Sequence, residues 1–127
     1  MKKALKINVE NQSIEAIEIN DSKDIYAQIG NGCQLFEIPF EFENGDGLYC
    51  DEESLLRGQD IKGGFMMPDW RIPIVGNAII LGCDEEGDSI SCKSTISEFE
   101  GKVKFFDAKT CQDYAKRALS QVQIKSW

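Results

Sequence analysis

The chain has 127 residues, which is the usual size of one domain. Its hydrophobic fraction of 42% and charged fraction of 28% exclude a wholly disordered chain, a collagen-like repeat and a membrane protein. With 14 Lys and Arg against 22 Asp and Glu, the net charge of -8 argues against direct nucleic-acid binding, because phosphate contacts need clustered cations.

The first part of the chain predicts a hairpin followed by a helix. Apolar and polar side chains alternate over residues 2–9, which is typical of a half-buried strand. A second strand is expected over residues 14–19, where a break in the alternation would fit a bulge. Asn20 or Asp21 can cap a helix over residues 21–29, which two following glycines would stop.

A second hairpin is predicted in the next part. Residues 36–40 alternate, the Asn44–Gly47 segment is a strong turn signal, and an apolar strand follows over residues 48–50. Pro39 should restrict the first of these strands to a sheet edge or a bulge, since proline has no N–H to donate. One helical turn is expected within residues 51–58.

The most apolar run of the chain predicts a central strand. Residues 59–71 show no clear period and are expected to form a long loop. Residues 74–81 are almost continuously apolar, which favours a single strand that is covered on both faces and ends at Gly82. The acidic segment Asp84–Asp88 should be a tight turn into the next strand.

The last part predicts two helices. Thr95 and Glu98 match a capping box for a short helix. Residues 103–106 fit either a strand or a helical continuation. Asp107 can cap an amphipathic helix over about residues 108–122, whose expected apolar face consists of Cys111, Ala115, Ala118, Leu119 and Val122.

These elements together favour a single α+β domain over residues 1–127. Hairpins outnumber the helical crossovers that a parallel sheet would need, so the sheet should be mainly antiparallel and twisted. The helix at residues 21–29 and the C-terminal helix are expected to pack on it.

The charge is unevenly distributed along the chain. Residues 41–100 carry 14 acidic and four basic side chains, whereas residues 101–127 carry two acidic and six basic ones. This acidic middle is either a solvated surface or a docking face for a basic protein. The carboxylates that would form such a face are Glu41, Glu43, Asp46, Asp51, Glu52, Glu53, Asp84, Glu85, Glu86 and Asp88. We expect a monomer, with a homodimer that joins the basic and acidic parts as the alternative.

The sequence offers little support for familiar catalysis. It contains no histidine, which removes Ser-His-Asp, Cys-His and His-based zinc sites together. The five cysteines show no CxxC spacing, and the Asp84–Asp88 turn lacks the ligand spacing of an EF-hand loop. We therefore expect no metal, no cofactor and no catalytic residue. With no apolar segment long enough for a signal peptide or a bilayer span, the chain is expected in a reducing cytoplasm.

The segment Gly63–Trp70 combines two glycines with large apolar side chains that are costly to leave in water. It is expected either to fold over the protein's own core or to form a ligand-covering or interface loop. Its candidate contact residues are Phe65, Met66, Met67 and Trp70. A small-ligand or nucleotide site under this loop, with an unusual enzyme as one form of it, is the alternative function.

Several segments resemble a family of small uncharacterised domains found in phages, prophages and plasmids. The resemblance covers residues 3–106, and its most distinctive part pairs an apolar strand containing Val-Gly-Asn with a following Asp-Glu-Glu-Gly-Asp turn. The matching segments are Lys3–Asn8, Glu43–Asp46, Leu48–Glu53, Leu55–Leu56, Ile74–Gly82 and Asp84–Asp88. The chain departs from the family pattern at Ser54, where glycine is usual, and in its basic C-terminal helix.

The resemblance implies a genomic setting. It indicates an accessory protein that a mobile element expresses in the cytoplasm of a bacterial host, where such proteins modify host processes or block host defence. Acidic proteins of this kind can occupy nucleic-acid channels by presenting carboxylates in place of phosphates. We therefore expect a non-enzymatic protein whose partner is a host protein with a basic surface.

Overall fold

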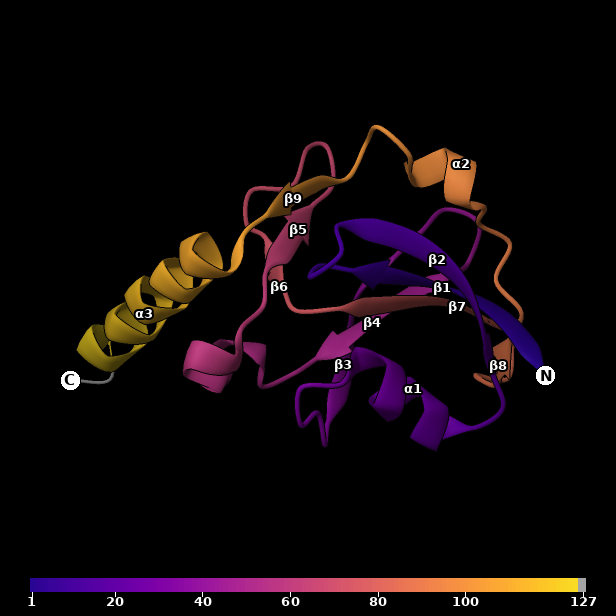
Figure 1. Cartoon of the computed structure of the whole chain (residues 1–127). Coiled ribbons are helices and arrows are strands. Elements are labelled where there is room, and N and C mark those ends of the chain that lie inside the picture. Colours follow the sequence, from indigo (N-terminus) through magenta and orange to yellow (C-terminus); the bar gives the residue numbers. More distant parts are fainter. Residues whose placement is uncertain (126–127) are drawn as a thin grey trace.

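A six-stranded antiparallel sheet forms the centre of the structure (Figure 1). This computed structural model describes the backbone of residues 1–125 and the side chains of residues 1–120. The strands of the sheet are β1 (Lys2–Asn8), β2 (Ser13–Ile19), β3 (Phe36–Glu41), β4 (Gly47–Asp51), β7 (Ala78–Cys83) and β8 (Ser89–Ile90). Their order is β2-β1-β7-β4-β3, with β8 paired to the end of β7.

A smaller sheet and several helices complete the fold. The smaller sheet has the order β6-β5-β9, with β5 (Gly64–Met66), β6 (Ile74–Val75) and β9 (Lys104–Phe106). The helical segments are α1 (Ser22–Ile29), the 3-10 segment η1 (Ser54–Asp60), α2 (Ile96–Phe99) and α3 (Ala108–Lys125). The predicted α+β class, with a mainly antiparallel sheet in a single compact domain, is confirmed.

Strand β7 contributes to the core on both faces of the large sheet. Ile79 and Leu81 pack with Ile25 of α1 on one face. Because successive side chains of a strand point to opposite faces, Ile80 packs on the other face, together with Phe65 of the small sheet. The side chains of Ile79, Ile80 and Leu81 are 0% exposed, so the predicted central strand is confirmed for these residues.

The apolar run 74–81 is nevertheless not one strand. Ile74 and Val75 belong to β6 of the small sheet, whereas Ala78 begins β7 of the large sheet. The chain changes sheet at Gly76, whose φ of +92° suits glycine. The expectation of one continuous strand is wrong because hydropathy does not reveal this change of backbone direction.

The predicted long loop over residues 59–71 also contains a strand, β5. Glycine is required there by close packing, since a Cβ atom on Gly64 would lie 2.6 Å from the carbonyl oxygen of Ile74 and 2.8 Å from Sγ of Cys111. The adjacent glycines therefore mark a close approach of β5 to β6 and α3. Because glycine has no side chain, this segment lacks the alternation of apolar and polar residues from which a strand is predicted.

The two predicted hairpins differ in regularity. β1 and β2 pair in continuous register from Lys2 opposite Ile19 to Asn8 opposite Ser13, so the bulge considered there is not found. The irregular apolar spacing of β2 instead reflects a strand with both faces partly covered. In the second hairpin the register shifts around Pro39, and β3 lies at the sheet edge, as predicted.

Helices α1 and α3 begin at the predicted caps. The capping box predicted at Thr95 is not formed in α2, because the Thr95 hydroxyl donates to the Glu98 carboxylate and makes no hydrogen bond with the helix backbone. The Asp21 side chain accepts a hydrogen bond from the backbone N–H of Asp24, and the Asp24 side chain completes a capping box at α1. Asp107 accepts a bond of 2.8 Å from the N–H of Thr110 at the start of α3. The two alternatives for residues 103–106 are resolved in favour of a strand, β9.

The two long helices pack on different parts of the fold. α1 covers one face of the large sheet, and α3 lies against η1 and the small sheet (Figure 1). Cys111 and Ala115 are the buried contacts of α3, as expected from their spacing. Ala118 and Leu119 are half-buried, and the side chain of Val122 lies outside the described residues.

Candidate functional site

Most of the predicted docking residues gather at one end of the large sheet. Gly47 lies opposite Leu81, so the turn before β4 and the turn after β7 lie at the same end of the sheet. We call this group the acidic end: it consists of Glu41, Glu43, Asp84, Glu85, Glu86 and Asp88. Asp84 is half-buried and the other five carboxylates are exposed. Sequence reasoning offered these residues as candidates, and the sheet register places them at the same end of the sheet.

Asp46 has a structural position beneath the acidic end. Its side chain is 1% exposed. It accepts hydrogen bonds from the hydroxyl of Ser94 at 2.6 Å, from the N–H of Ser94 at 2.8 Å and from the N–H of Lys93 at 3.0 Å. Asp46 therefore anchors the segment before α2 to the β3–β4 turn, and its carboxylate is turned away from any partner.

The remaining three candidates lie at the opposite end of the sheet. β4 ends there at Asp51, which is 4% exposed and paired with Arg57. Glu53 is half-buried and donates its backbone N–H to the Asp51 carboxylate at 3.0 Å, whereas Glu52 is exposed. These residues do not belong to the surface that the acidic end presents.

An apolar groove adjoins the acidic end along the edge strand β3. We call it the β3 groove; it has a volume of about 250 Å³ and is lined by Pro39, Phe40, Trp70, Arg71, Ile72 and Ile74. The Phe40 and Trp70 rings lie 5.5 Å apart, and Phe40 is 38% exposed while Ile72 is 63% exposed. Glu41 directly follows Phe40, so apolar and acidic groups share this edge.

The interface-loop residues divide between core and surface. Phe65 is 0% exposed and belongs to the core between the two sheets. Met66 and Met67 are half-buried, and Trp70 bridges the buried Phe65 and the exposed Phe40, with ring centroids 5.8 Å and 5.5 Å away. The segment thus folds over the protein's own core, and Trp70 alone among the four lines the groove.

Sequence reasoning missed the exposed apolar side chains of the groove. The alternation over residues 36–40 indicated a strand, but it did not show that Phe40 turns away from the α1 side. Phe36 packs on Tyr49 at 5.3 Å, whereas Phe40, after the irregularity at Pro39, packs on Trp70. Proline within the strand was the available signal for this change of face.

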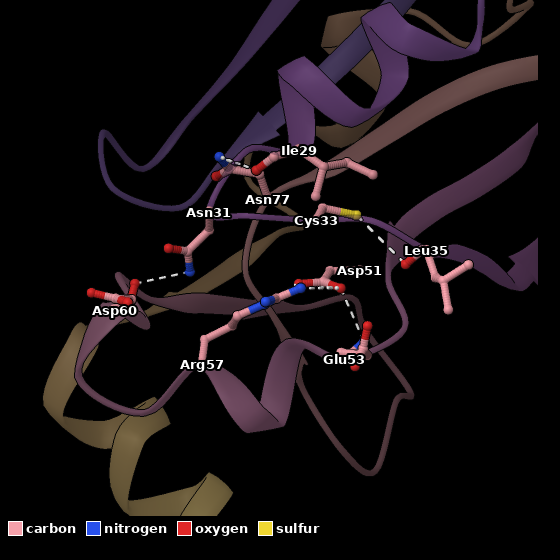
Figure 2. Close-up of polar contacts among 9 residues, drawn as sticks. All are labelled: Ile29, Asn31, Cys33, Leu35, Asp51, Glu53, Arg57, Asp60 and Asn77. Atoms are coloured by element: carbon pink, nitrogen blue, oxygen red, sulfur yellow. Dashed lines mark hydrogen bonds and ion pairs between the residues drawn. The ribbon is translucent and has the colours of Figure 1, made fainter.

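A polar cleft lies at the other end of the sheet (Figure 2). It has a volume of about 300 Å³ and is formed by the ends of β1 and α1, by η1 and by the junction between β6 and β7. Asn77 bridges two of these segments by accepting from the N–H of Val9 at 2.9 Å and donating to the carbonyl of Ile29 at 3.3 Å. The sequence analysis did not identify this cleft, because its lining comes from segments far apart in the chain.

The buried thiols near this end are poor nucleophiles. Burial, reinforced by the nearby Asp51 carboxylate, raises the pKa of Cys33 to about 11. Burial and the Glu37 carboxylate raise the pKa of Cys50 to about 12. Burial also raises the pKa of Cys111 in α3 to about 11. Because the thiolate is the reactive form, these three cysteines are unreactive at neutral pH.

A bilayer-spanning helix and a cluster of metal-ligating side chains are both absent from the described residues. Between residues 1 and 125, no helix combines the length and the apolar character that crossing a bilayer requires. In the same part of the chain, no cluster of three or more His, Cys, Asp or Glu side chains is arranged to hold a metal ion.

Comparison with known proteins gives a family. A family model described as "Domain of unknown function (DUF3846)" matches residues 1–104, which include everything from β1 to α2 and the first residue of β9. Helix α3 follows the matched region. No curated protein and no solved structure matches the chain. The match covers most of the sequence, and the chain therefore belongs to the DUF3846 family of domains of unknown function.

Proposed function

We propose that this protein is a non-enzymatic binding module that docks a partner protein through the β3 groove and the acidic end. The partner segment carries apolar side chains that enter the groove and basic side chains that face the carboxylates. The observation that supports this most directly is the contact between the exposed Phe40 and the half-buried Trp70 beside Glu41. Apolar anchors within a charged rim are typical of protein interfaces.

The groove and the carboxylates have different roles in this proposal. Burial of Phe40 and Ile72 by the partner supplies the affinity, since apolar surface leaves water. The acidic end accelerates association with a basic surface and selects against acidic proteins. Pro39 lacks an N–H, so recognition depends on side chains more than on the addition of a strand to β3.

The resemblance to domains of phages, prophages and plasmids supports a particular kind of partner. We place it among the cytoplasmic proteins of a bacterial host, with interference in host defence as the biological consequence. Mimicry of nucleic acid by the acidic end is one form of this function, in which the partner's basic surface is its own nucleic-acid site.

The test is capture of a partner from bacterial lysate with matched variants. The wild-type protein is compared with Phe40→Ala/Ile72→Ala in the groove and with Leu56→Ala on η1, since Leu56 is 63% exposed like Ile72 but lies outside the groove. We expect a partner that wild type and Leu56→Ala capture and the groove variant loses. Equal capture by all three proteins, or no partner at any salt concentration, would contradict the proposal.

A second comparison tests the carboxylates. Glu41→Gln/Glu43→Gln should weaken capture at low salt more than at high salt, because screening already removes most of the attraction at high salt. Glu10→Gln/Glu100→Gln is the matched control, with two exposed carboxylates outside the acidic end. Displacement of the partner by added duplex DNA would identify the mimicry form.

A further inference from the structure

The polar cleft has a surplus of cations in an otherwise acidic protein. Lys6, Arg57 and Lys62 contribute to its lining, against the carboxylates of Glu10 and Asp51. Arg57 neutralises Asp51 directly, so the two lysines face a single unpaired carboxylate. The chain as a whole has 22 acidic and 14 basic residues, so the balance of charge in the cleft has the opposite sign.

The guanidinium of Arg57 is held in a fixed orientation by Asp51 and keeps N–H donors that Asp51 does not use. Its Nε lies 2.8 Å from Oδ2 of Asp51 and its Nη2 lies 3.2 Å from Oδ1, which is a bidentate pair. In the part of the chain whose side chains are described, Nη1 makes no hydrogen bond. The side chain of Arg57 is 22% exposed and that of Asp51 is 5% exposed, so the carboxylate is buried behind the guanidinium.

The walls of the cleft are tied together before any ligand binds. Asn77 links the end of β1 to the end of α1. Asn31 donates its side-chain amide to the carbonyl of Asp60 at 2.9 Å, which links α1 to η1 (Figure 2). Lys6 Nζ donates to Oε1 of Gln28 at 3.3 Å. A rigid site binds its ligand without first losing the conformational entropy of its own residues.

Two features of the cleft would oppose an anion: the Glu10 carboxylate and the C-terminal end of α1, of which the second is partly offset. The C-terminal end of α1 carries the negative pole of the helix dipole. However, the carbonyl of Ile29 already accepts the Asn77 amide, and Gly30 donates its N–H back to Tyr26 at 2.9 Å. Lys6, Lys62 and Nη1 of Arg57 therefore remain in the cleft as positively charged donors for an anion.

We propose that the polar cleft binds a small phosphorylated molecule, whose phosphate lies among Arg57, Lys6 and Lys62. A doubly charged phosphate matches this group of cations better than a singly charged carboxylate does, and the planar guanidinium of arginine can donate to two of the phosphate oxygens. The volume of about 300 Å³ is at the lower end of the range for ligand sites, so the organic part of the ligand is small.

An NMR titration of the full chain with inorganic phosphate, at constant ionic strength adjusted with chloride, tests this site. We expect saturable shifts of the backbone amides that line the cleft, namely those of Gly30, Asn31, Lys62, Gly76 and Asn77. Acetate, a single charge, should produce much weaker shifts at the same amides. Failure to saturate, or equal shifts with acetate and phosphate, would overturn the proposal.

Lysine variants give the second readout. Lys6→Gln and Lys62→Gln should each weaken phosphate binding by about tenfold, because each removes one close charge. Lys109→Gln is the control, since Lys109 lies on α3 with its side chain 85% exposed and should leave binding unchanged. Loss of binding in all three variants alike would indicate general charge attraction and contradict a cleft site. The groove variants Phe40→Ala and Ile72→Ala should not alter this titration, so the two proposals can fail separately.

Discussion

Each end of the large sheet contains a buried aspartate at one end of β4. The two carboxylates differ in the groups that donate hydrogen bonds to them. Asp46, at the acidic end, receives neutral donors from the backbone and hydroxyl of Ser94 and from the backbone of Lys93. Asp51, at the cleft end, receives the guanidinium of Arg57. Neutral donors can hold a buried carboxylate without introducing a positive charge, whereas an ion pair brings its cation to the same place.

This difference explains why one chain can present two contrasting surfaces. At the acidic end no cationic side chain of residues 1–120 forms an ion pair with Asp46, and the carboxylates that surround it are mostly exposed. At the cleft end Arg57 pairs with Asp51 and still directs Nη1 away from it. The positions of the two aspartates along β4 therefore help to determine which end could attract cations and which could attract anions.

The largest effect is expected from removing the Asp46 carboxylate. Asp46→Ala leaves a buried hydroxyl and two N–H groups without their acceptor, and it should lower the free energy of unfolding by about 3 kcal/mol. Urea unfolding measures the change. Asp88→Ala, at an exposed position of the same end, should change stability by less than about 0.5 kcal/mol. A similar small loss in both variants would show that water replaces the aspartate easily.

Thiol labelling should distinguish the two ends by rate. Cys83 is exposed at the acidic end, whereas Cys33 and Cys50 are buried toward the cleft end, with pKa values raised to about 11 and about 12. Burial and the raised pKa both slow the labelling of Cys33 and Cys50. The exposed Cys83 should therefore label first, and Cys83→Ser should remove the fast phase.

The raised thiol pKa values also predict the direction of a pH effect on stability. An unfolded cysteine ionises near pH 8.5, below the folded values of about 11 and about 12. The contribution of these two buried thiols to the free energy of unfolding is therefore complete below pH 8.5. It decreases as the pH rises from 8.5 toward the folded pKa values of about 11 and about 12. The melting temperature should therefore decrease as the pH is raised through this range. The decrease, measured from each protein's own melting temperature at neutral pH, should be smaller in Cys50→Ala than in wild type.

The ion pair at the cleft end should have a smaller effect than Asp46. Arg57→Ala should cost about 2 kcal/mol, because Asp51 keeps the N–H of Glu53 but loses its cation. Asp51→Asn, and the double variant with Arg57→Ala, complete a thermodynamic cycle that isolates the coupling between the two side chains. A coupling energy near zero would mean that the pair orients Arg57 without stabilising the fold.

The smallest effect is expected at the end of α3 beyond its buried contacts. Leu119 is half-buried, so Leu119→Ala should cost about 1 kcal/mol, less than the roughly 2 to 5 kcal/mol of a fully buried leucine. Because α3 packs on Ile61 and Val75, which also line the cleft, amide shifts in this variant should appear at the cleft end only. Shifts at the acidic end would contradict separate behaviour of the two ends.

Local patterns predicted the elements whose causes are local. The alternation of β1, the Asp21 cap of α1 and the turn at Asn44–Gly47 each depend on neighbouring residues, and each was found where expected. The same patterns failed at Gly64 and Gly76. There the reasons for glycine are a contact with α3 and a change of sheet, which involve residues distant in sequence.

The candidate sites show the same limit. The sequence determined that the middle of the chain is acidic and that an apolar segment surrounds Trp70. Only the pairing of β4 with β7 decided which carboxylates lie at the same end of the sheet. Only burial decided that Asp46 and Asp51 have structural positions. The polar cleft had no sequence signature at all, since its lining from Lys6 to Asn77 is assembled by the tertiary structure. Composition and local period are properties of neighbouring residues, whereas register, burial and concave surfaces arise from contacts between segments that the chain itself keeps far apart.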